Sequence, residues 1–248
     1  PPHQTECATF QARLPDDGRP SKVASDLVKR QLNSSYGAAY YPWVKIRDVI
    51  NTRDVWVPPS TVALGVMGYT EERDKVWFAP AGFNRGGLSE GNSGLPVLQV
   101  SHELLSAQRD KLYEANINPI ASFVSEGLVI FGQKTLQSTP SALDRINVRR
   151  LLIFIKKEIS RIANRLLFDQ NLPATWNRFT GLVNPKLEEI KTGLGLTDFR
   201  VILDPTTTTP DLIDRNIMYA KIFLKPARSI EFIAVDFIIT RTGASFDD

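Results

Sequence analysis

The sequence predicts an α/β (α+β) fold in which helices flank a mixed sheet, with an extended strand at the C-terminal end. Three observations predict it. Short runs rich in β-branched and aromatic residues alternate with helical patterns along most of the chain. Residues 142–168 carry apolar side chains at steps of three and four, as an amphipathic helix does. Residues 229–240 form a long apolar run close to the C-terminus.

The residue pattern of the first half predicts a βαβ-like unit, followed by a helix and a loop. Ser21 is placed to cap the first helix, and the Pro58-Pro59-Ser60 sequence opens the second one, because proline suits the first turn of a helix. The glycine-rich composition that follows the second helix is typical of a loop. The expected elements are a strand over 6–11, a helix over 22–32, a strand over 38–46, a helix over 61–70 and a loop over 79–94.

The second half predicts five more strands and four helical segments. The helix over 142–168 is expected to be the longest of the chain. Asn184-Pro185 is expected to separate two helical pieces, since proline interrupts a helix but fits the start of a new one. The expected strands are 96–100, 119–123, 128–131, 199–203 and 218–225, and the expected helices are 103–113, 142–168, 175–182 and 185–192.

The C-terminal run at 229–240 is apolar on both faces and is interrupted only by Glu231 and Asp236. A strand of this kind needs cover above and below. It either closes the sheet of its own domain beside residues 218–225, or it is donated to a neighbouring molecule by strand addition. The residues expected to make the contact are Ile230, Phe232, Ile233, Val235, Phe237 and Ile239.

Composition limits the classes of function. The chain has 248 residues, a formal net charge of +3 and one cysteine, so it gives little support to general nucleic-acid binding and excludes an internal disulfide. One cysteine and two histidines are too few for a Cys/His zinc site. No segment reads as a membrane span or a signal peptide, which predicts a soluble, cytosolic chain. The Pro-Pro start without Met suggests that further residues precede it.

Catalytic, metal and cofactor-binding residues are not expected. The glycines at 82–87 lack the Lys-Ser/Thr ending of a phosphate-binding loop. His102 beside Glu103 could act as a general base, but such a pair at a helix start is usually a cap or exposed, and no nucleophile signature accompanies it. Cys7 is interpreted as a small buried apolar residue.

The long helix carries a stripe of positive charge. A solvated face is the simpler interpretation, and an acidic partner surface is the functional alternative. Nucleic acid is a weaker candidate, because no exposed aromatic residues are interleaved. The residues are Arg145, Arg149, Arg150, Lys156, Lys157, Arg161 and Arg165.

Several motifs, taken in order, resemble the tail sheath proteins of contractile phage tails. In the first half they are AAYYPWVKI (38–46), WVPPSTVALGV (56–66) and VWFAPAG (76–82). In the second half they are NPI (118–120), GLVIFGQKTL (127–136), INVRRLLIFIKKEI (146–159) and FIAVDFIIT (232–240). The resemblance is strongest to sheaths of T-even-like myophages, with relatives in R-type pyocins and type VI secretion systems.

The resemblance implies a structural protein and not an enzyme. Many copies would form a helical sleeve around an inner tail tube, bounded by baseplate and terminator proteins, in a virion assembled in the host cytoplasm. The sleeve would contract from a metastable extended state and drive the tube through the host envelope, without a nucleotide or other cofactor. Another self-assembling viral shell protein, or less plausibly a doubly wound α/β enzyme, is the alternative.

The resemblance also implies a domain division and two contact regions. Residues 1–95 would form the N-terminal part of the sheath core, 96–228 the C-terminal sheath domain, and 229–248 a linker arm exchanged between subunits. An N-terminal arm and protruding domains would precede residue 1. Pro226-Ala227-Arg228 would be the hinge of the C-terminal arm. The residues expected to face the tube are Arg149, Lys156, Lys157 and Arg161.

Overall fold

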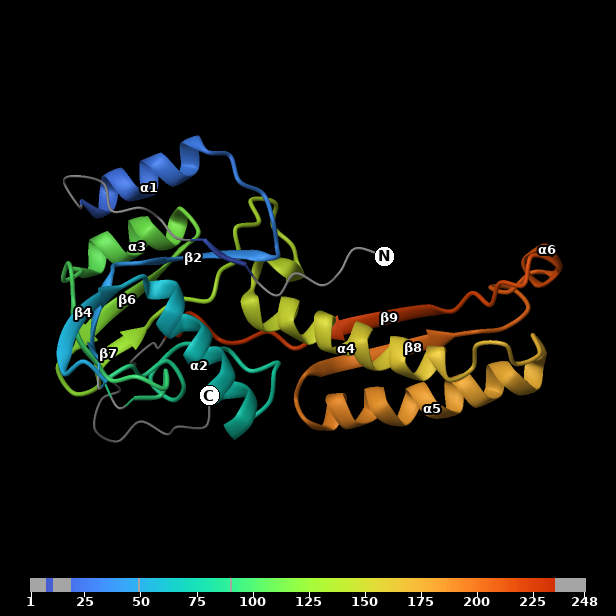
Figure 1. Cartoon of the computed structure of the whole chain (residues 1–248). Helices are drawn as coiled ribbons and strands as arrows, with labels where there is room; N and C mark the ends of the chain where they lie inside the picture. Colours follow the sequence, from blue (N-terminus) through green and yellow to red (C-terminus); the bar gives the residue numbers. More distant parts are fainter. Residues whose placement is uncertain (1–7, 11–18, 49, 90, 235–248) are drawn as a thin grey trace, which may run out of the picture.

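Two bodies of different construction follow one another along the chain, a head built on two sheets and an elongated extension of helices and a strand pair (Figure 1). The head runs from strand β1 to the short helix η1, and the extension from helix α4 to strand β9. The computed structural model describes residues 8–10, 19–48, 50–89 and 91–234, and only the backbone of 8–10. The predicted α/β architecture with mixed strand pairing is confirmed.

The larger sheet of the head has the order β1-β2-β6-β7. β1, β2 and β6 are parallel, and β7 returns antiparallel to β6, so the sheet is mixed. Helices α1 and α3 cover one face and α2 the other. The bounds are β1 Ala8–Phe10, α1 Pro20–Lys29, β2 Gly37–Tyr41, α2 Pro59–Arg73, α3 Ser106–Glu114, β6 Ile117–Phe123 and β7 Gly127–Ile130.

Strand β2 shows how the sheet separates two apolar cores. All five of its residues are buried, which is expected for a strand covered on both faces. Ala38 and Tyr40 point into the core beneath α2, whereas Ala39 and Tyr41 point into the core beneath α1 and α3. The alternation follows from the two-residue period of a strand.

A second, antiparallel sheet of order β4-β3-β5 completes the head. The strand predicted over 38–46 is wrong as a single element, because the chain passes between the two sheets at Pro42 and Trp43. Proline has no backbone N–H and does not continue a sheet ladder. β4 was not predicted. The bounds are β3 Val44–Asp48, β4 Arg53–Val57 and β5 Val97–Val100.

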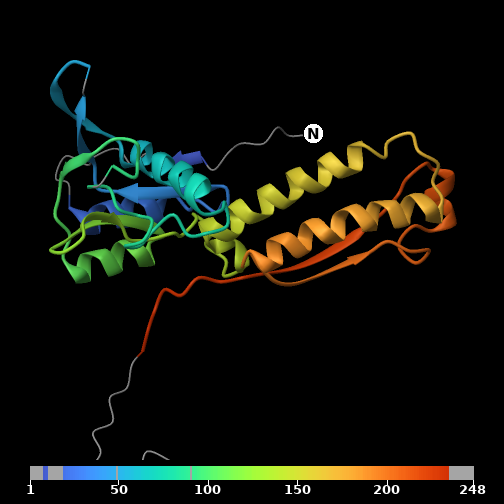
Figure 2. The same cartoon turned by 90° about the horizontal axis from the view of Figure 1, so that it is seen from below.

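The extension consists of the paired helices α4 and α5 packed on an antiparallel strand pair, β8 and β9, with the short helix α6 at its far end (Figures 1 and 2). Its core is one cluster drawn from both helices and both strands. Trp77, from the segment after α2, also inserts into this core. The bounds are η1 Ala142–Asp144, α4 Ile146–Asn164, α5 Pro173–Thr192, β8 Leu196–Ile202, α6 Pro210–Asp214 and β9 Lys221–Pro226.

Several helix predictions are corrected. Ser21 lies inside α1 and does not cap it, because the helix already begins at Pro20. Residues 142–168 are not one helix, since Arg145 has an extended backbone between η1 and α4. α5, with 20 residues, is longer than α4, with 19, and continues through Pro185. Gly181 stands four residues before that proline and is exposed, so its carbonyl can face water where the helical hydrogen bond is missing.

The predicted domain boundary between residues 95 and 96 stays a prediction, but it does not separate two sheets. β2 and β6, from either side of it, are paired neighbours. Likewise β3 pairs with β5 across the same boundary. Within the described ranges, no helix has both the length and the apolar content needed to cross a bilayer.

Candidate interaction surfaces

The segment that follows β9 runs from the extension back to the head and then leaves the body (Figure 2). Its first hydrogen bond, from the Ala227 N–H to the Gly195 carbonyl, is 3.1 Å long. Residues 227–234 are in no strand or helix. Residues 229–232 line a cavity of about 290 Å³ together with α3 and residues 131–133 of the head. The described part of the predicted C-terminal strand therefore does not pair beside β9.

A polar cluster holds this segment on the head. Arg145 donates from Nε and Nη2 to the two carboxylate oxygens of Glu231, at 2.6 and 2.9 Å. Gln133 donates to the Ser229 hydroxyl, and at 3.3 Å to Glu231. A bidentate arginine–carboxylate pair fixes both position and orientation. Sequence patterns gave Arg145 only as one member of the basic stripe and Glu231 only as an interruption of a strand.

Two further ionisable groups border the cluster. Burial, and then the negative charge of Glu231, raise the pKa of the Tyr113 hydroxyl. Burial, and then the positive charge of Arg145, lower the pKa of Lys134. Lys134 donates to the Tyr113 carbonyl at 2.7 Å and lies over the Tyr113 ring at 4.2 Å. The cluster is thus a connected network of polar groups around one carboxylate.

The apolar side chains of the same segment are exposed. Ile230, Phe232 and Ile233 keep 81%, 84% and 80% of their surface accessible. Val235, Phe237 and Ile239, the other residues predicted for strand exchange, lie outside the described residues. Ile230, Phe232 and Ile233 lie in no strand, and the prediction that a second subunit receives all six residues stays a prediction.

The β8–β9 pair offers open strand edges. Leu196 to Ile202 pair with Lys221 to Pro226, and in the described part of the chain neither strand has a second neighbour. Phe199 and Leu224 face the helices and belong to the core of the extension. A strand pair of this size is marginal without further strands or helix cover. Its outer edges carry backbone N–H and C=O groups able to pair with an added strand.

The basic stripe of α4 is divided by the structure. Arg149 is only 6% exposed; it lies over the Tyr36 ring at 4.1 Å and donates to the Ser35 hydroxyl, so the expectation that it lies on an outer stripe is wrong. Arg150 is held on α2 by Glu71, at 3.0 Å. Lys156 and Lys157, further along α4, are exposed.

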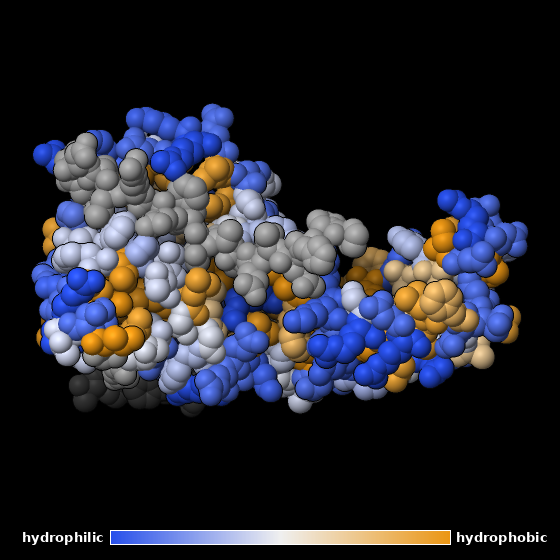
Figure 3. All heavy atoms as spheres, in the orientation of Figure 1, coloured by the Kyte–Doolittle hydropathy of each residue, from blue (hydrophilic) through white to orange (hydrophobic). Residues whose placement is uncertain are grey.

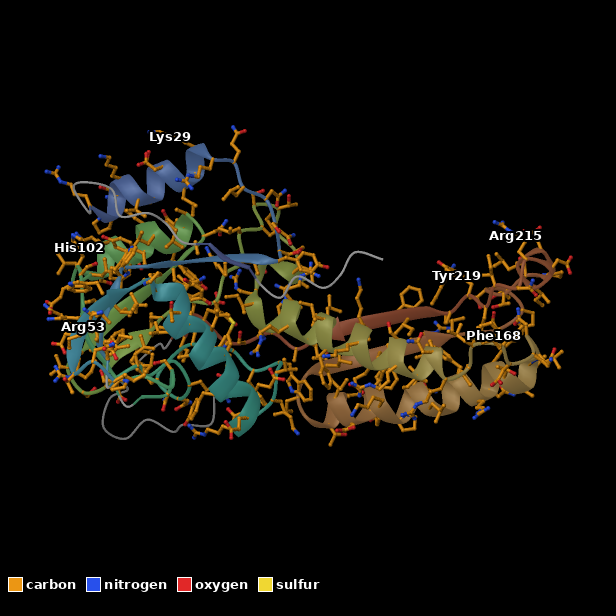
Figure 4. The ribbon with its side chains drawn as sticks, viewed as in Figure 1. Lys29, Arg53, His102, Phe168, Arg215 and Tyr219 are labelled. Atoms are coloured by element: carbon orange, nitrogen blue, oxygen red, sulfur yellow. The ribbon has the colours of Figure 1, made fainter. Side chains whose placement is uncertain are left out.

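Arg161 is also exposed and pairs with Glu158 at 3.0 Å, an arrangement of small energetic value at a surface. Figure 3 shows that the visible face of the extension is mainly hydrophilic, with apolar groups at its far end. Phe168, Arg215 and Tyr219 lie at that end (Figure 4). The exposed cations of the basic stripe are therefore Lys156, Lys157 and Arg161 of α4 and Arg165, its C-cap residue.

The glycine-rich loop closes an edge of the head sheet. The Gly82 N–H donates to the Ile130 carbonyl at 2.9 Å, and the Ile130 N–H donates to the Gly86 carbonyl at 2.8 Å. The Leu88 N–H continues the pairing to Leu128 at 2.7 Å. A Cβ at Gly86 would approach the Ile130 carbonyl oxygen to 2.7 Å, so this close approach requires glycine. Because these amides are bonded to β7, they are not free to cradle a phosphate.

His102, the candidate general base, makes structural contacts in the head. His102 stacks on Tyr41 and lies 3.1 Å from the Ser101 hydroxyl (Figure 4 shows its place in the head). Cys7 lies outside the described residues. Among the residues that the structure describes, no group of three or more His, Cys, Asp or Glu side chains could hold a metal ion.

Comparisons with known proteins agree with this picture of a chain that offers binding surfaces. Residues 138–240, which include α4, α5, β8, β9 and the segment after them, match the phage tail sheath C-terminal domain. Residues 138–240 belong to that family. The resemblance to tail sheaths predicted from the sequence motifs is confirmed.

Individual relatives extend the similarity to most of the chain. The tail sheath protein of Vibrio phage KVP40 is 40% identical over 199 residues, which are 80% of this chain and 29% of that protein. The tail sheath protein of Enterobacteria phage T4 is 37% identical over 221 residues, which are 88% of this chain and 32% of that protein. The chain therefore spans less than a third of the length of either relative. These relatives are structural proteins, in agreement with the prediction of a non-enzyme.

A solved structure supports the fold. The sheath complex of an extracellular contractile injection system, PVC, in its contracted state superposes with a TM-score of 0.76. The match covers 93% of this chain and 62% of that chain, at 24% sequence identity. The head and the extension therefore have the architecture of a contractile sheath subunit.

Proposed function

We propose that this chain is part of a structural subunit of a contractile tail sheath. The observation that carries the proposal is its similarity to tail sheath proteins over most of its length. The subunit polymerises with copies of itself into a helical sleeve around an inner tail tube. It is a component of the virion, assembled in the host cytoplasm, with the baseplate and a tail terminator protein at the two ends of the sleeve.

The sleeve contracts from a metastable extended state, which stores the energy at assembly, and drives the tube through the host envelope. A polymer of this kind needs no nucleotide, because the two lattices differ in the free energy of their subunit contacts. It needs connections that survive a large movement between subunits. Main-chain pairing between strands meets this need, because it depends little on side-chain identity.

The connection is provided by the C-terminal arm, residues 229–248, which is donated to a neighbouring subunit. The exposed Ile230, Phe232 and Ile233 support this proposal, because these side chains have little cover from the residues that the structure describes. The open edges of β8 and β9 support an acceptor at the extension of the neighbour. There the arm adds a strand and covers its own apolar residues.

The tube contact is provided by exposed cations of α4. Lys156, Lys157 and Arg161 face water, whereas Arg149 is packed against Tyr36 and is no longer included. Exposed ion pairs contribute only about 0–1 kcal/mol each, which suits a contact that must release during contraction. Reversing the charge with Lys156→Glu and Lys157→Glu is expected to reduce tube-dependent assembly, measured as the length of sleeves per tube. Unchanged sleeves would remove α4 from the tube interface.

The test of the sheath proposal is electron microscopy of the full-length protein produced together with its inner tube. Hollow striated sleeves are expected. A second version ends after Ala234, so that it keeps Glu231 and the polar cluster but lacks the rest of the arm. This version is expected to give dispersed subunits.

Each outcome separates two interpretations. Sleeves from both versions would keep the sheath function and reject arm exchange. Closed particles from the full-length protein would favour another viral shell protein. No polymer from the full-length protein would reject the proposed function.

A further inference from the structure

In the segment Ser229 to Ile233 the charged side chain is largely buried and the apolar side chains are exposed, which is the reverse of an ordinary surface segment. The Glu231 side chain is only 16% exposed. Its neighbours Ile230 and Phe232 are more than four-fifths exposed. Burying a carboxylate costs free energy unless it is paired, and exposing large apolar side chains gives up the hydrophobic effect. A segment that does both is held by its charge and not by its apolar residues.

The partner of Glu231 is built into the rigid part of the head. Arg145 is the N-cap residue of α4, and its backbone forms a bridge with Lys134. Its side chain is 26% exposed and makes a second ion pair, at 3.2 Å, with Asp144. Gln133, next to the bridge, contacts both Ser229 and Glu231. Glu231 is therefore fixed at the junction where the head meets the first turn of α4.

The stretch before the cluster is also held. Pro226 pairs with Leu196 as the last residue of β9, and the Ala227 N–H donates to the Gly195 carbonyl. Only Arg228 lies between this hydrogen bond and the contact of Ser229 with Gln133. A hinge at 226–228, as the sequence suggested, would have to break contacts on both of its sides.

We propose that Arg145 and Gln133 clamp Glu231 and make it the pivot of the C-terminal arm, so that the arm moves relative to its own subunit only beyond residue 231. The proposal rests on the arm exchange described above. The clamp keeps the apolar side of the segment turned outward, where a second copy of this chain can cover it. Arg145, Gln133 and Glu231 are thus positioning residues for subunit exchange.

The first test measures the arm in the dispersed full-length protein. Spin labels at Lys29→Cys on α1 and at the exposed Ile230→Cys, between Ser229 and Glu231, report the distance between the head and the clamped part of the arm, in a Cys7→Ser background. The clamp predicts a narrow distance distribution that broadens at least twofold with Glu231→Gln. Glu188→Gln, at an exposed position of α5, is the control and is expected to change nothing.

A double-variant cycle tests whether Arg145 and Glu231 act as one pair. Arg145→Met is expected to broaden the distribution as much as Glu231→Gln, and the double variant no more than either. Circular dichroism checks that the helical content of each variant is unchanged, so that broadening does not reflect unfolding. An unchanged distribution in Glu231→Gln, or fully additive broadening, would overturn the clamp.

The second test asks whether the pivot holds during assembly. Arg145→Cys and Glu231→Cys are joined with a short bis-maleimide before the protein is mixed with tubes. The clamp predicts that the linked protein gives at least as many sleeves as the unlinked pair, because the link replaces the ion pair that the two substitutions remove. If the unlinked cysteine pair assembles and the linked one does not, the arm must move at or before residue 231 and the proposal fails, while the sheath function stands. If the full-length protein without substitutions forms no sleeves but the spin-labelled variant shows the clamp, the sheath function fails and the clamp stands.

Discussion

The head and the extension solve the problem of burying apolar surface in different ways. In the head, the sheet separates two cores, and helices cover both faces. The extension has one core, with two helices on one face of a strand pair whose edges are open. A sheet covered by helices on both faces buries its apolar residues within one chain, whereas a strand pair covered on one face leaves its edges available to strands of another chain. This difference supports the proposal that subunit contacts are made at the extension.

The largest expected effect concerns Trp77, the head residue that completes the core of the extension. Its Nε1 donates to the Gly193 carbonyl at 2.7 Å, and its ring packs 5.8 Å from that of Phe154. Trp77→Ala is expected to lower the free energy of unfolding by about 3–5 kcal/mol, measured by urea denaturation. Hydrogen exchange is expected to place the loss in α4 and α5. Trp56→Ala, on β4 and 46% exposed, is the control. Loss of protection in the head alone would show that the ring serves the head instead.

A matched pair of leucines compares the two cores directly. Leu112 is fully buried in the head, and Leu187 is 1% exposed in the extension. Each change to alanine is expected to lower the free energy of unfolding by about 2–5 kcal/mol, because each removes apolar contacts and leaves a cavity. If the bodies are distinct, Leu112→Ala speeds exchange mainly in β2 and β6, and Leu187→Ala mainly in α4 and α5. Equal acceleration everywhere in both variants would show a single cooperative unit.

Two exposed helical glycines provide a smaller, stabilising comparison. A Cβ at Gly68 of α2 or Gly181 of α5 would meet nothing within 4 Å. Each change to alanine is expected to raise the free energy of unfolding by about 0.5–1 kcal/mol, since glycine loses more backbone entropy in a helix. Gly65→Ala is the opposite control, because its Cβ would lie 1.9 Å from the Ser93 carbonyl oxygen. If Gly181→Ala lowered the free energy of unfolding, α5 would need glycine at the position four residues before Pro185.

The smallest expected effect is electrostatic. A hydrogen bond from Thr206 lowers the pKa of the Asp204 carboxyl in the extension, and one from Arg47 lowers that of Asp54 in the head, each below the ordinary value of an aspartate. A lowered carboxylate pKa stabilises the fold above the unfolded value, and the contribution is lost as pH falls through the folded value. Melting temperatures are expected to fall slightly less on acidification in Asp204→Asn and Asp54→Asn than in the parent. Identical pH profiles would show that neither group contributes.

Periodicity predicted the elements whose burial is decided locally. The apolar steps of α4 and the β-branched run of β6 and β7 follow from patterns within a few residues. The prediction of one strand over 38–46 was wrong because Pro42 stands inside the apolar and β-branched run and marks the point where the chain leaves one sheet for the other. Periodicity also missed β4, whose two charged residues, Arg53 and Asp54, conceal its alternation.

The candidate surfaces were harder to predict, because they depend on contacts between distant residues. Arg149 belongs to a basic stripe in the sequence, but the fold brings Tyr36 over its guanidinium. Glu231 stands 86 positions from Arg145, so no local pattern relates them. One signal was available: a lone carboxylate inside an apolar run needs a partner, and the start of α4 is rich in arginine.

The hydrogen bonds between the glycine-rich loop and β7 have a consequence for the fidelity of assembly. A subunit that exports a strand risks binding that strand at any exposed sheet edge, including its own. With Gly82, Gly86 and Leu88 bonded along β7, a stray arm would have to displace a covalently tethered competitor before it could pair there. Under the proposed arm exchange, the loop would therefore protect the β7 edge against misassembly, and an added strand would pair at an edge that the chain's own loop does not occupy.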